Sequence, residues 1–232
     1  MTHLKTLFFG MAGCEFTNEC VDHLFQLGFD VRTILTKKRG EPFPSDALNW
    51  NGDLIISYKC YWKIPTSLLA KARLAAVNFH PSLPEYRGSG GYCWALYDER
   101  EHYGVTVHHM SSELDQGEII SVETFPIEKA DNLHSLSEKT SVFSVSVVKK
   151  FFSSLVALDD KQLLSRLHPD PAPARWKGPV RKISEVNAMK LIDDSLSVSE
   201  IDKRIRAFHC LKYPMRKKIG SKVFNLGAIY EL

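Results

Sequence analysis

Residues 74–80 read LAAVNFH, are followed by Pro81, and have the pattern of a strand inside a parallel sheet. Apolar residues fill most of this stretch, which is typical of a strand covered on both faces. Three similar runs precede it, and two helical patterns lie among them. The strand runs cover residues 4–10, 30–36 and 53–58, and the helical patterns cover residues 16–27 and 65–72. This alternation predicts an α/β protein with a Rossmann-like, mostly parallel twisted sheet.

The second half of the chain adds two strands, a long helix and a linker. Residues 104–110 and 118–127 have strand patterns, and an apolar stripe over residues 132–158 predicts a helix with Asn132 as its N-cap. Four prolines within residues 168–179 indicate a linker. We therefore expect a main domain and a small C-terminal segment made of a helix and a β-hairpin. The domain covers residues 1–178, the segment residues 179–232, its helix residues 198–208 and its turn residues 219–223.

Composition and charge exclude several classes of protein. The apolar runs fall far short of the roughly 18–20 residues that cross a bilayer, so no membrane partner is expected. The first ten residues have the pattern of a strand and not of a signal peptide. The five cysteines form no CxxC pair, which argues against a disulfide framework or a zinc site and fits a reducing cytoplasm. The net charge of +3 is too small to indicate nucleic-acid binding, although residues 179–232 carry +5 and residues 1–178 carry −2.

Asn78 and His80 form the first candidate functional pair. Because residues i and i+2 of a strand point to one side, both side chains should face one cleft while Phe79 faces the core. In open parallel sheets, ligands bind in a cleft beyond the carboxyl ends of the strands. An amide can donate a hydrogen bond to an oxyanion, and an imidazole can move a proton near neutral pH. Taken alone, the pair is also compatible with a strand-end cap and a histidine satisfied in the core.

The loop at residues 111–117, which reads SSELDQG, is the second candidate. It joins two strands, and Asp115 within it could reach the imidazole of a neighbouring strand and hold that ring in one tautomer. The alternative is a turn with solvated acidic side chains. His108 and His109 precede the loop, but neighbours on a strand point to opposite faces, so we expect no metal site there.

Together, these stretches resemble the folate-dependent formyltransferase family, which includes glycinamide ribonucleotide, methionyl-tRNA and nucleotide-amino-sugar N-formyltransferases. The resemblance rests on NFHPSLPEYRG at residues 78–88 and YGVTVHHMSSELDQGEII at residues 103–120, and it covers roughly residues 1–178 in the order of elements. The signature of the family is Asn-x-His-Pro, then a strand, then an Asp-x-Gly loop. Its members fall here on Asn78, His80, Pro81, Asp115 and Gly117.

One departure from the family concerns the loop after the histidine. Many relatives have a double leucine after His-Pro-Ser, whereas this chain continues as Leu83-Pro84-Glu85 and is one residue shorter. We therefore expect a reshaped loop at the entrance to the substrate cleft.

The resemblance implies transfer of a formyl group from N10-formyltetrahydrofolate, as co-substrate, to a primary amine, without a metal. Asn78 and His80 would stabilise the oxygen of the tetrahedral intermediate, and Asp115 would orient or charge His80. In relatives, the pterin is held largely by backbone groups of the loop after the third strand and by the aspartate loop. The corresponding candidates are Tyr58, Tyr61, Trp62, Ile64, Leu114 and Gly117 for folate, and Gly10, Met11, Arg87 and Gly88 for the acceptor.

The C-terminal segment favours a nucleotide-linked amino-deoxysugar as the acceptor. IRAFH at residues 205–209, followed by Tyr213-Pro214, resembles the short C-terminal segment of the tRNA and amino-sugar branches, and the chain after Gly178 is shorter than the extra domain of a tRNA enzyme. We expect a dTDP-, GDP- or UDP-linked 3- or 4-amino sugar, formylated for a surface polysaccharide such as lipopolysaccharide O-antigen. The sugar diphosphate would be met by basic residues of the segment, namely Arg181, Lys182, Arg216 and Lys217.

Three other functions remain open from the sequence. The first is transfer to another amine, glycinamide ribonucleotide or methionyl-tRNA. The second is hydrolysis of formyltetrahydrofolate, in which water replaces the amine. The third is a folate-binding module without catalysis. In each case, the free edge of the C-terminal hairpin could pair with a second copy, which makes a homodimer possible.

Overall fold

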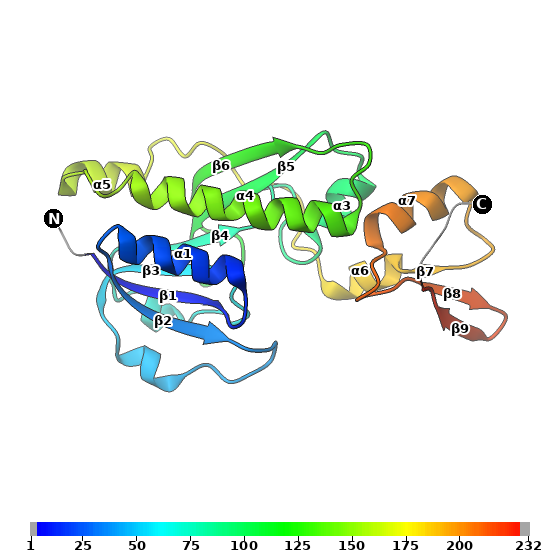
Figure 1. Cartoon of the computed structure of the whole chain (residues 1–232), viewed down its shortest axis with the longest axis horizontal. Coiled ribbons are helices and arrows are strands. Elements are labelled where there is room, and N and C mark those ends of the chain that lie inside the picture. The colour runs from blue at the N-terminus through cyan, green and yellow to red at the C-terminus, as the bar shows by residue number, and fades with distance from the viewer. Residues whose placement is uncertain (1–3, 228–232) are drawn as a thin grey trace.

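The computed structural model describes residues 4–227, and its centre is a six-stranded sheet in the order β2-β1-β3-β4-β5-β6 (Figure 1). Strands β1 to β4 are parallel to one another, whereas β5 and β6 run antiparallel at one edge. The mostly parallel, Rossmann-like α/β sheet predicted from the sequence is therefore confirmed. The bounds of the strands are β1 Lys5–Met11, β2 Asp30–Thr36, β3 Gly52–Tyr58, β4 Ala72–His80, β5 His102–His109 and β6 Ile119–Pro126.

The strand order creates a crevice at one end of the sheet. The chain passes from β1 to β2 on one side and then returns to place β3 on the other side of β1. At such a switch point the connections leave the carboxyl ends of the strands in opposite directions, which leaves room for a ligand between them. The carboxyl ends of β1, β3 and β4 lie at this crevice.

Strands β1 and β3 send their apolar side chains alternately into two cores, as the two-residue repeat of a strand requires. Phe8 and Ile56 belong to the core under α1 and α4, which cover one face of the sheet in Figure 1. Leu7 and Ile55 belong to a second core on the other face, beside η1 and α2. Burial on both faces explains the nearly continuous apolar runs of the sequence. The bounds of these helices are α1 Glu15–Gln26, η1 Ser45–Asn49, α2 Thr66–Leu69 and α4 Leu133–Ser153.

The C-terminal segment lies at one end of the molecule and is joined to the main domain by a third core (Figure 1). Within this core, the ring of Phe208 on α7 lies 5.2 Å from that of Trp94 on α3. The predicted helix and hairpin are confirmed, and Gly220 takes the left-handed φ of 60° that its two-residue turn needs. The elements are α3 Gly91–Tyr97, α6 Ile183–Met189, β7 Leu191–Ile192, α7 Val198–Phe208, β8 Arg216–Ile219 and β9 Lys222–Asn225.

Two predicted helices have different bounds in the structure. The helix expected over residues 132–158 is capped by Asn132, as predicted, but it ends at Ser153. A separate helix, α5 (Asp160–Leu167), follows, because the side chain of Asp159 accepts from the backbone of Gln162 and starts a new helix. The helix expected over residues 65–72 covers only Thr66–Leu69, since β4 already begins at Ala72.

The last five residues of the expected C-terminal segment and the first three residues of the chain lie outside the described part. Within residues 4–227, no helix combines the length and the apolar character that a membrane crossing needs.

Candidate active site

A cleft of about 540 Å³ lies at the carboxyl ends of β1, β3 and β4. Asn78 and His80 line it from the end of β4, while Phe79 between them is 1% exposed and packs against Phe151 of α4. The prediction that the amide and the imidazole share one face, with the phenyl ring in the core, is therefore confirmed. Pro81 follows directly and belongs to the turn that ends the strand.

Asp115 lies against His80, as the sequence predicts. The Oδ1 atom of Asp115 is 3.5 Å from Nδ1 of His80, and both side chains are nearly buried. The other ring nitrogen of His80, Nε2, is 3.3 Å from the carbonyl oxygen of Tyr86. Each nitrogen of this imidazole therefore faces an oxygen, so a proton on either one has an acceptor.

Residues 87 and 88 hold Asp115 in place by two hydrogen bonds. The N–H of Gly88 donates to Oδ2 of Asp115 at 2.9 Å, and Nε of Arg87 donates to the backbone oxygen of Asp115 at 2.8 Å. Asp115 itself has a left-handed φ of 50°, a conformation that Asp tolerates better than most residues. One carboxylate oxygen is thus anchored by an amide, and the other is left for His80.

Gly117 closes the aspartate loop by a close backbone approach. A Cβ atom at this position would lie 1.8 Å from the carbonyl oxygen of His109, well inside van der Waals contact. Only glycine lets the loop return this tightly to the end of β5, which explains the glycine of the Asp-x-Gly motif. Gly117 does not line the cleft, so it shapes the cleft only through the position of the loop.

His108 is a site residue that the sequence reasoning missed. Antiparallel pairing places His108 of β5 opposite Asn78 of β4, and its Nε2 atom lies 3.0 Å from Nδ2 of Asn78. Nε2 is also 3.7 Å from Oδ1 of Asp115. The sequence contained a signal for this residue. If Asp115 reaches His80, the strand before the Asp115 loop must lie beside the strand of His80, and His108 is on that strand. His109, on the opposite face, instead stacks on His168 with ring centroids 4.5 Å apart.

The hydrogen bonds of His108 determine its tautomer and the orientation of the Asn78 amide. Nδ1 of His108 is 2.8 Å from the carbonyl oxygen of His109, which can only accept, so Nδ1 carries the hydrogen. Burial, and next the neighbouring His80, lower the pKa of His108 to about 4, so the ring is neutral near pH 7. Nε2 therefore accepts a hydrogen bond from the Asn78 amide. The second hydrogen of that amide remains available for another acceptor.

The residues expected to hold folate fall into two groups. Tyr61, Trp62, Ile64 and Leu114 line the cleft. The side chain of Tyr58 instead points into the core, 1% exposed, with its hydroxyl 2.7 Å from Oγ of Ser144 on α4. The phenol of Tyr58 therefore does not face the cleft, because it lies on the α4 side of β3.

The residues expected to bind the acceptor are also divided. Met11 and Gly88 line the cleft, whereas Gly10 is buried in β1 and the side chain of Arg87 is used to hold the backbone of Asp115. The four basic residues expected to meet a diphosphate do not line the cleft. Two of them lie on β8 and contact other residues of the C-terminal segment: Arg216 donates to the backbone of Asn187, and Lys217 pairs with Asp194.

Three other cations line the cleft, namely Arg39, Lys59 and Lys63. The guanidinium of Arg39 lies 4.9 Å from the ring centre of Tyr61. Nζ of Lys59 donates to Oγ of Ser141 at 2.8 Å, and burial lowers the pKa of this lysine. The charge available to an anionic ligand therefore comes from the main domain. Among residues 4–227, no group of three His, Cys, Asp or Glu side chains is arranged to hold a metal ion.

Comparison with known proteins gives the same relationship that the motifs indicate. The family model described as formyl transferase matches residues 37–150. The chain is 33% identical, over 141 residues, to methionyl-tRNA formyltransferase of Staphylococcus aureus (strain MW2), a match that covers 56% of this chain and 45% of that protein. The chain spans about half the length of the curated relatives it matches.

Solved structures resemble the chain over nearly its whole length. A sugar N-formyltransferase from a Shewanella species superposes with a TM-score of 0.74 at 16% identity, covering 98% of both chains. An N-formyltransferase from Helicobacter canadensis, in complex with folinic acid and dTDP-3-aminofucose, gives a TM-score of 0.65 at 16% identity, covering 94% of this chain and 84% of that one. At these identities the likeness shows a shared fold. The motifs, the matching family model and the fold together show that this chain belongs to the formyl transferase family of enzymes.

Proposed function

We propose that the chain transfers a formyl group from N10-formyltetrahydrofolate to the primary amine of a nucleotide-linked amino-deoxysugar. The observation that carries this proposal is the convergence of Asn78, His80 and Asp115 at one cleft, with Oδ1 of Asp115 3.5 Å from His80. An amide donor, an imidazole and a carboxylate are the groups that acyl transfer between two nitrogens requires.

In the proposed reaction, the neutral amine attacks the formyl carbon and a new carbon–nitrogen bond forms. The carbonyl oxygen becomes an oxyanion, and the free hydrogen of the Asn78 amide is the donor that would stabilise it. The attacking nitrogen loses a proton, and the folate nitrogen gains one as its bond to carbon breaks. His80, with Asp115 against it, would carry this proton directly or through water. Each proton lost by the acceptor is regained by the leaving group, so no other reactant is needed.

The folate would occupy the side of the cleft that is lined by residues 59–64 and 110–115. This side offers backbone groups of two loops, which suit a pterin edge that both donates and accepts hydrogen bonds. Support comes from the Helicobacter canadensis neighbour, which holds folinic acid. Arg39 and Lys63 would meet the carboxylates of a folate tail or the phosphates of the acceptor.

The acceptor would enter from the side lined by residues 88–92 and Ile183. Support for an amino sugar comes from solved sugar N-formyltransferases, whose folds match the C-terminal segment as well as the main domain. The Helicobacter canadensis neighbour holds dTDP-3-aminofucose. The curated tRNA relatives match this chain over only about half of their length. The product would serve a surface polysaccharide such as lipopolysaccharide O-antigen, and the reaction would take place in the cytoplasm.

The test is an acceptor panel with N10-formyltetrahydrofolate. The panel contains dTDP-, UDP- and GDP-linked 3-amino and 4-amino sugars, glycinamide ribonucleotide, methionyl-tRNA and a reaction without acceptor. Tetrahydrofolate release is followed by absorbance, and the formylated product by mass spectrometry. We expect one nucleotide amino sugar to be formylated and the Asp115→Asn variant to be inactive.

The other outcomes of the panel identify the competing functions. Formylation of glycinamide ribonucleotide or methionyl-tRNA alone would replace the amino sugar as acceptor. Formate release without acceptor would identify a hydrolase. Folate binding without turnover of any kind would identify a binding module.

The homodimer remains a prediction that rests on the C-terminal hairpin. Within the described part of the chain, β9 pairs with β8 on one edge only. Sedimentation at several protein concentrations tests whether a second copy occupies the other edge.

A further inference from the structure

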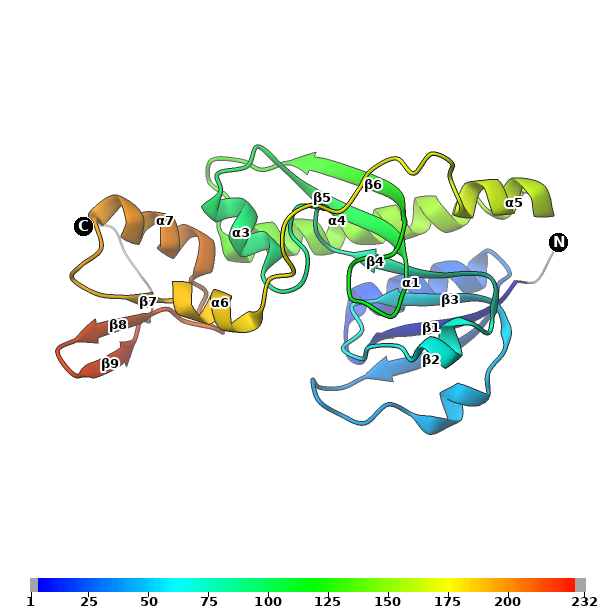
Figure 2. The ribbon, with the colours of Figure 1, turned by 180° about the vertical axis from the view of Figure 1, so that it is seen from behind.

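The linker before the C-terminal segment crosses the candidate active site. Figure 2 shows the chain after α5 running back across the sheet to α6. Nη1 of Arg87 donates to the carbonyl oxygen of Gly178, and the N–H of Lys177 donates to the carbonyl oxygen of Pro84. A short parallel bridge also joins Arg181 to Gly88. The linker is therefore bonded to the same loop that anchors Asp115.

Trp176 is the linker side chain that reaches the catalytic groups. Its ring meets that of His108 edge to face, with centroids 4.9 Å apart, and that of His80 at 5.9 Å. Its indole N–H donates to the carbonyl oxygen of Gly117 at 2.6 Å. One side chain thus contacts both imidazoles and the end of the aspartate loop.

The chemistry of the indole suits this position. An aromatic ring at the edge of an imidazole excludes water without offering a competing hydrogen bond on its faces. The N–H is the single donor of the indole, and here it binds the backbone of the loop and leaves Asp115 and both histidines to one another. A residue with this placement can fix the distances of 3.5 Å and 3.7 Å that separate Asp115 from His80 and His108.

We propose that Trp176 is a positioning residue for formyl transfer, which holds His108, His80 and the 115–117 loop in their working arrangement. This inference rests on the proposed function for its kinetic consequence, but its structural consequence does not depend on the acceptor. It also gives the linker a role in catalysis, because Trp176, just before the C-terminal segment, completes the site.

The kinetic experiment compares Trp176→Ala, Trp176→Phe and Trp50→Phe with the unchanged protein. Trp50 is a matched control, because it is buried, does not line the cleft, and its indole nitrogen has no hydrogen-bond partner among the described residues. We expect Trp176→Ala to lower kcat about 10- to 100-fold, since small displacements of catalytic groups cost that much. Trp176→Phe keeps the ring packing and loses one hydrogen bond, so kcat should fall about 3- to 10-fold. KM for folate should change less than threefold, and Trp50→Phe should leave kcat unchanged.

The second readout is the protonation of His108, followed by nitrogen-15 NMR of the histidine side chains. Removal of the indole admits water, so Trp176→Ala should raise the pKa of His108 from about 4 toward its usual range. Trp176→Phe should leave it low. The groups that face His108 from the elements around it are Asn78 and His80 of β4, His109 of β5, Asp115 of the loop and Trp176 itself.

The two readouts separate the proposals. If no acceptor is formylated but the His108 titration moves in Trp176→Ala, the proposed function fails while the positioning role stands. If Trp176→Ala does not fold, Trp176→Phe provides the test. A lower kcat with a nearly unchanged KM for folate supports the positioning role, and an unchanged kcat contradicts it. Unchanged kcat in both variants, or an unchanged His108 titration in folded Trp176→Ala, would overturn the positioning role.

Discussion

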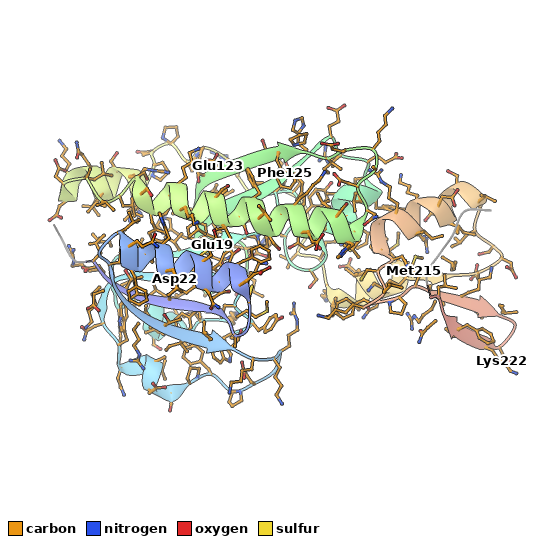
Figure 3. The ribbon with its side chains drawn as sticks, in the orientation of Figure 1. Glu19, Asp22, Glu123, Phe125, Met215 and Lys222 are labelled. Carbon is orange, nitrogen blue, oxygen red and sulfur yellow. The ribbon has the colours of Figure 1, made fainter. Side chains whose placement is uncertain are left out.

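The catalytic end of the main sheet and the C-terminal hairpin are built in opposite ways. At the catalytic end, Asn78, His108 and Asp115 come from two strands and a loop, and their polar atoms bind one another in a nearly buried cluster. In the hairpin, β8 and β9 follow each other directly, and the side chains of β9 are exposed. Figure 3 places Lys222 at the far end of the hairpin, away from the main sheet.

The buried cluster contains the groups proposed for the reaction, and the hairpin contains none of them. In the buried cluster each group fixes the hydrogen bonds of the next, so a change at one member should alter the others. In β9 the side chains contact mostly solvent, so changes there should act singly and weakly. The family assignment rests on the first region, and the identity of the acceptor does not follow from it.

Replacement of His80 should give the largest effect. His80→Asn removes the group proposed to move the proton, and kcat should fall about 10³-fold or more while folate binding stays within a few fold. Single-turnover formyl transfer measures the loss. His102→Asn makes the same change at an exposed position of β5 and should retain full activity. Near-normal turnover in His80→Asn would remove His80 from the mechanism.

The next largest effect should come from Gly117→Ala. The added Cβ meets the carbonyl oxygen of His109 and forces the aspartate loop away from β5. We expect kcat to fall about 100-fold and the free energy of unfolding to drop by about 1–3 kcal/mol. Gly227→Ala is the control, since a Cβ there meets no atom within 4 Å. Wild-type kinetics in Gly117→Ala would show that the loop does not need this close approach.

A smaller effect concerns His108 and pH. Because its pKa in the folded chain is about 4 and lies below the value of 6.5 for a free histidine, the unfolded chain binds the proton more tightly. His108 therefore stabilises the fold above about pH 6.5, and this contribution, at most about 3 kcal/mol, is lost as the pH falls toward 4. In His108→Leu, the free energy of unfolding measured with urea should change less between pH 6.5 and pH 4 than in the original protein. His134→Leu, at a side chain that is 73% exposed, should keep the pH dependence of the original protein.

The smallest effect should be found in the hairpin. Phe224 on β9 is 48% exposed, and Phe224→Ser should change the free energy of unfolding by less than about 0.5 kcal/mol and leave kcat unchanged. Thermal unfolding and the transfer assay measure both quantities. A large loss of activity in this variant would mean that the hairpin takes part in the site and would weaken the contrast between the two regions.

Local sequence patterns predicted much of the fold. Successive side chains of a strand point to opposite faces of the sheet. Asn78 and His80 could therefore be placed in the cleft, and Phe79 between them in the core. The hairpin turn followed from Gly220, because a tight turn needs a left-handed φ that glycine adopts readily. The break between α4 and α5 was missed, because the apolar stripe continues past the end of α4 while the cap at Asp159 starts a new helix.

The parts of the site that were missed depend on contacts between distant segments. His108 joins Asn78 because β5 pairs antiparallel with β4, and this pairing follows only if the expected approach of Asp115 to His80 is used to order the strands. Trp176 lies in a proline-rich stretch that has the pattern of a linker, and its contact with His108 depends on the path of that linker. Arg87 was expected at the acceptor, but it binds the backbone of Asp115, since side-chain partners across a loop have no sequence period.

The most direct test of the account is a double-mutant cycle of His80→Asn, Asp115→Asn and the combination of both, measured by single-turnover formyl transfer. If the two side chains act as one proton-transfer unit, the double variant should lose about as much activity as the worse single variant. Losses that multiply in the double variant, so that the two changes act independently, would contradict the account.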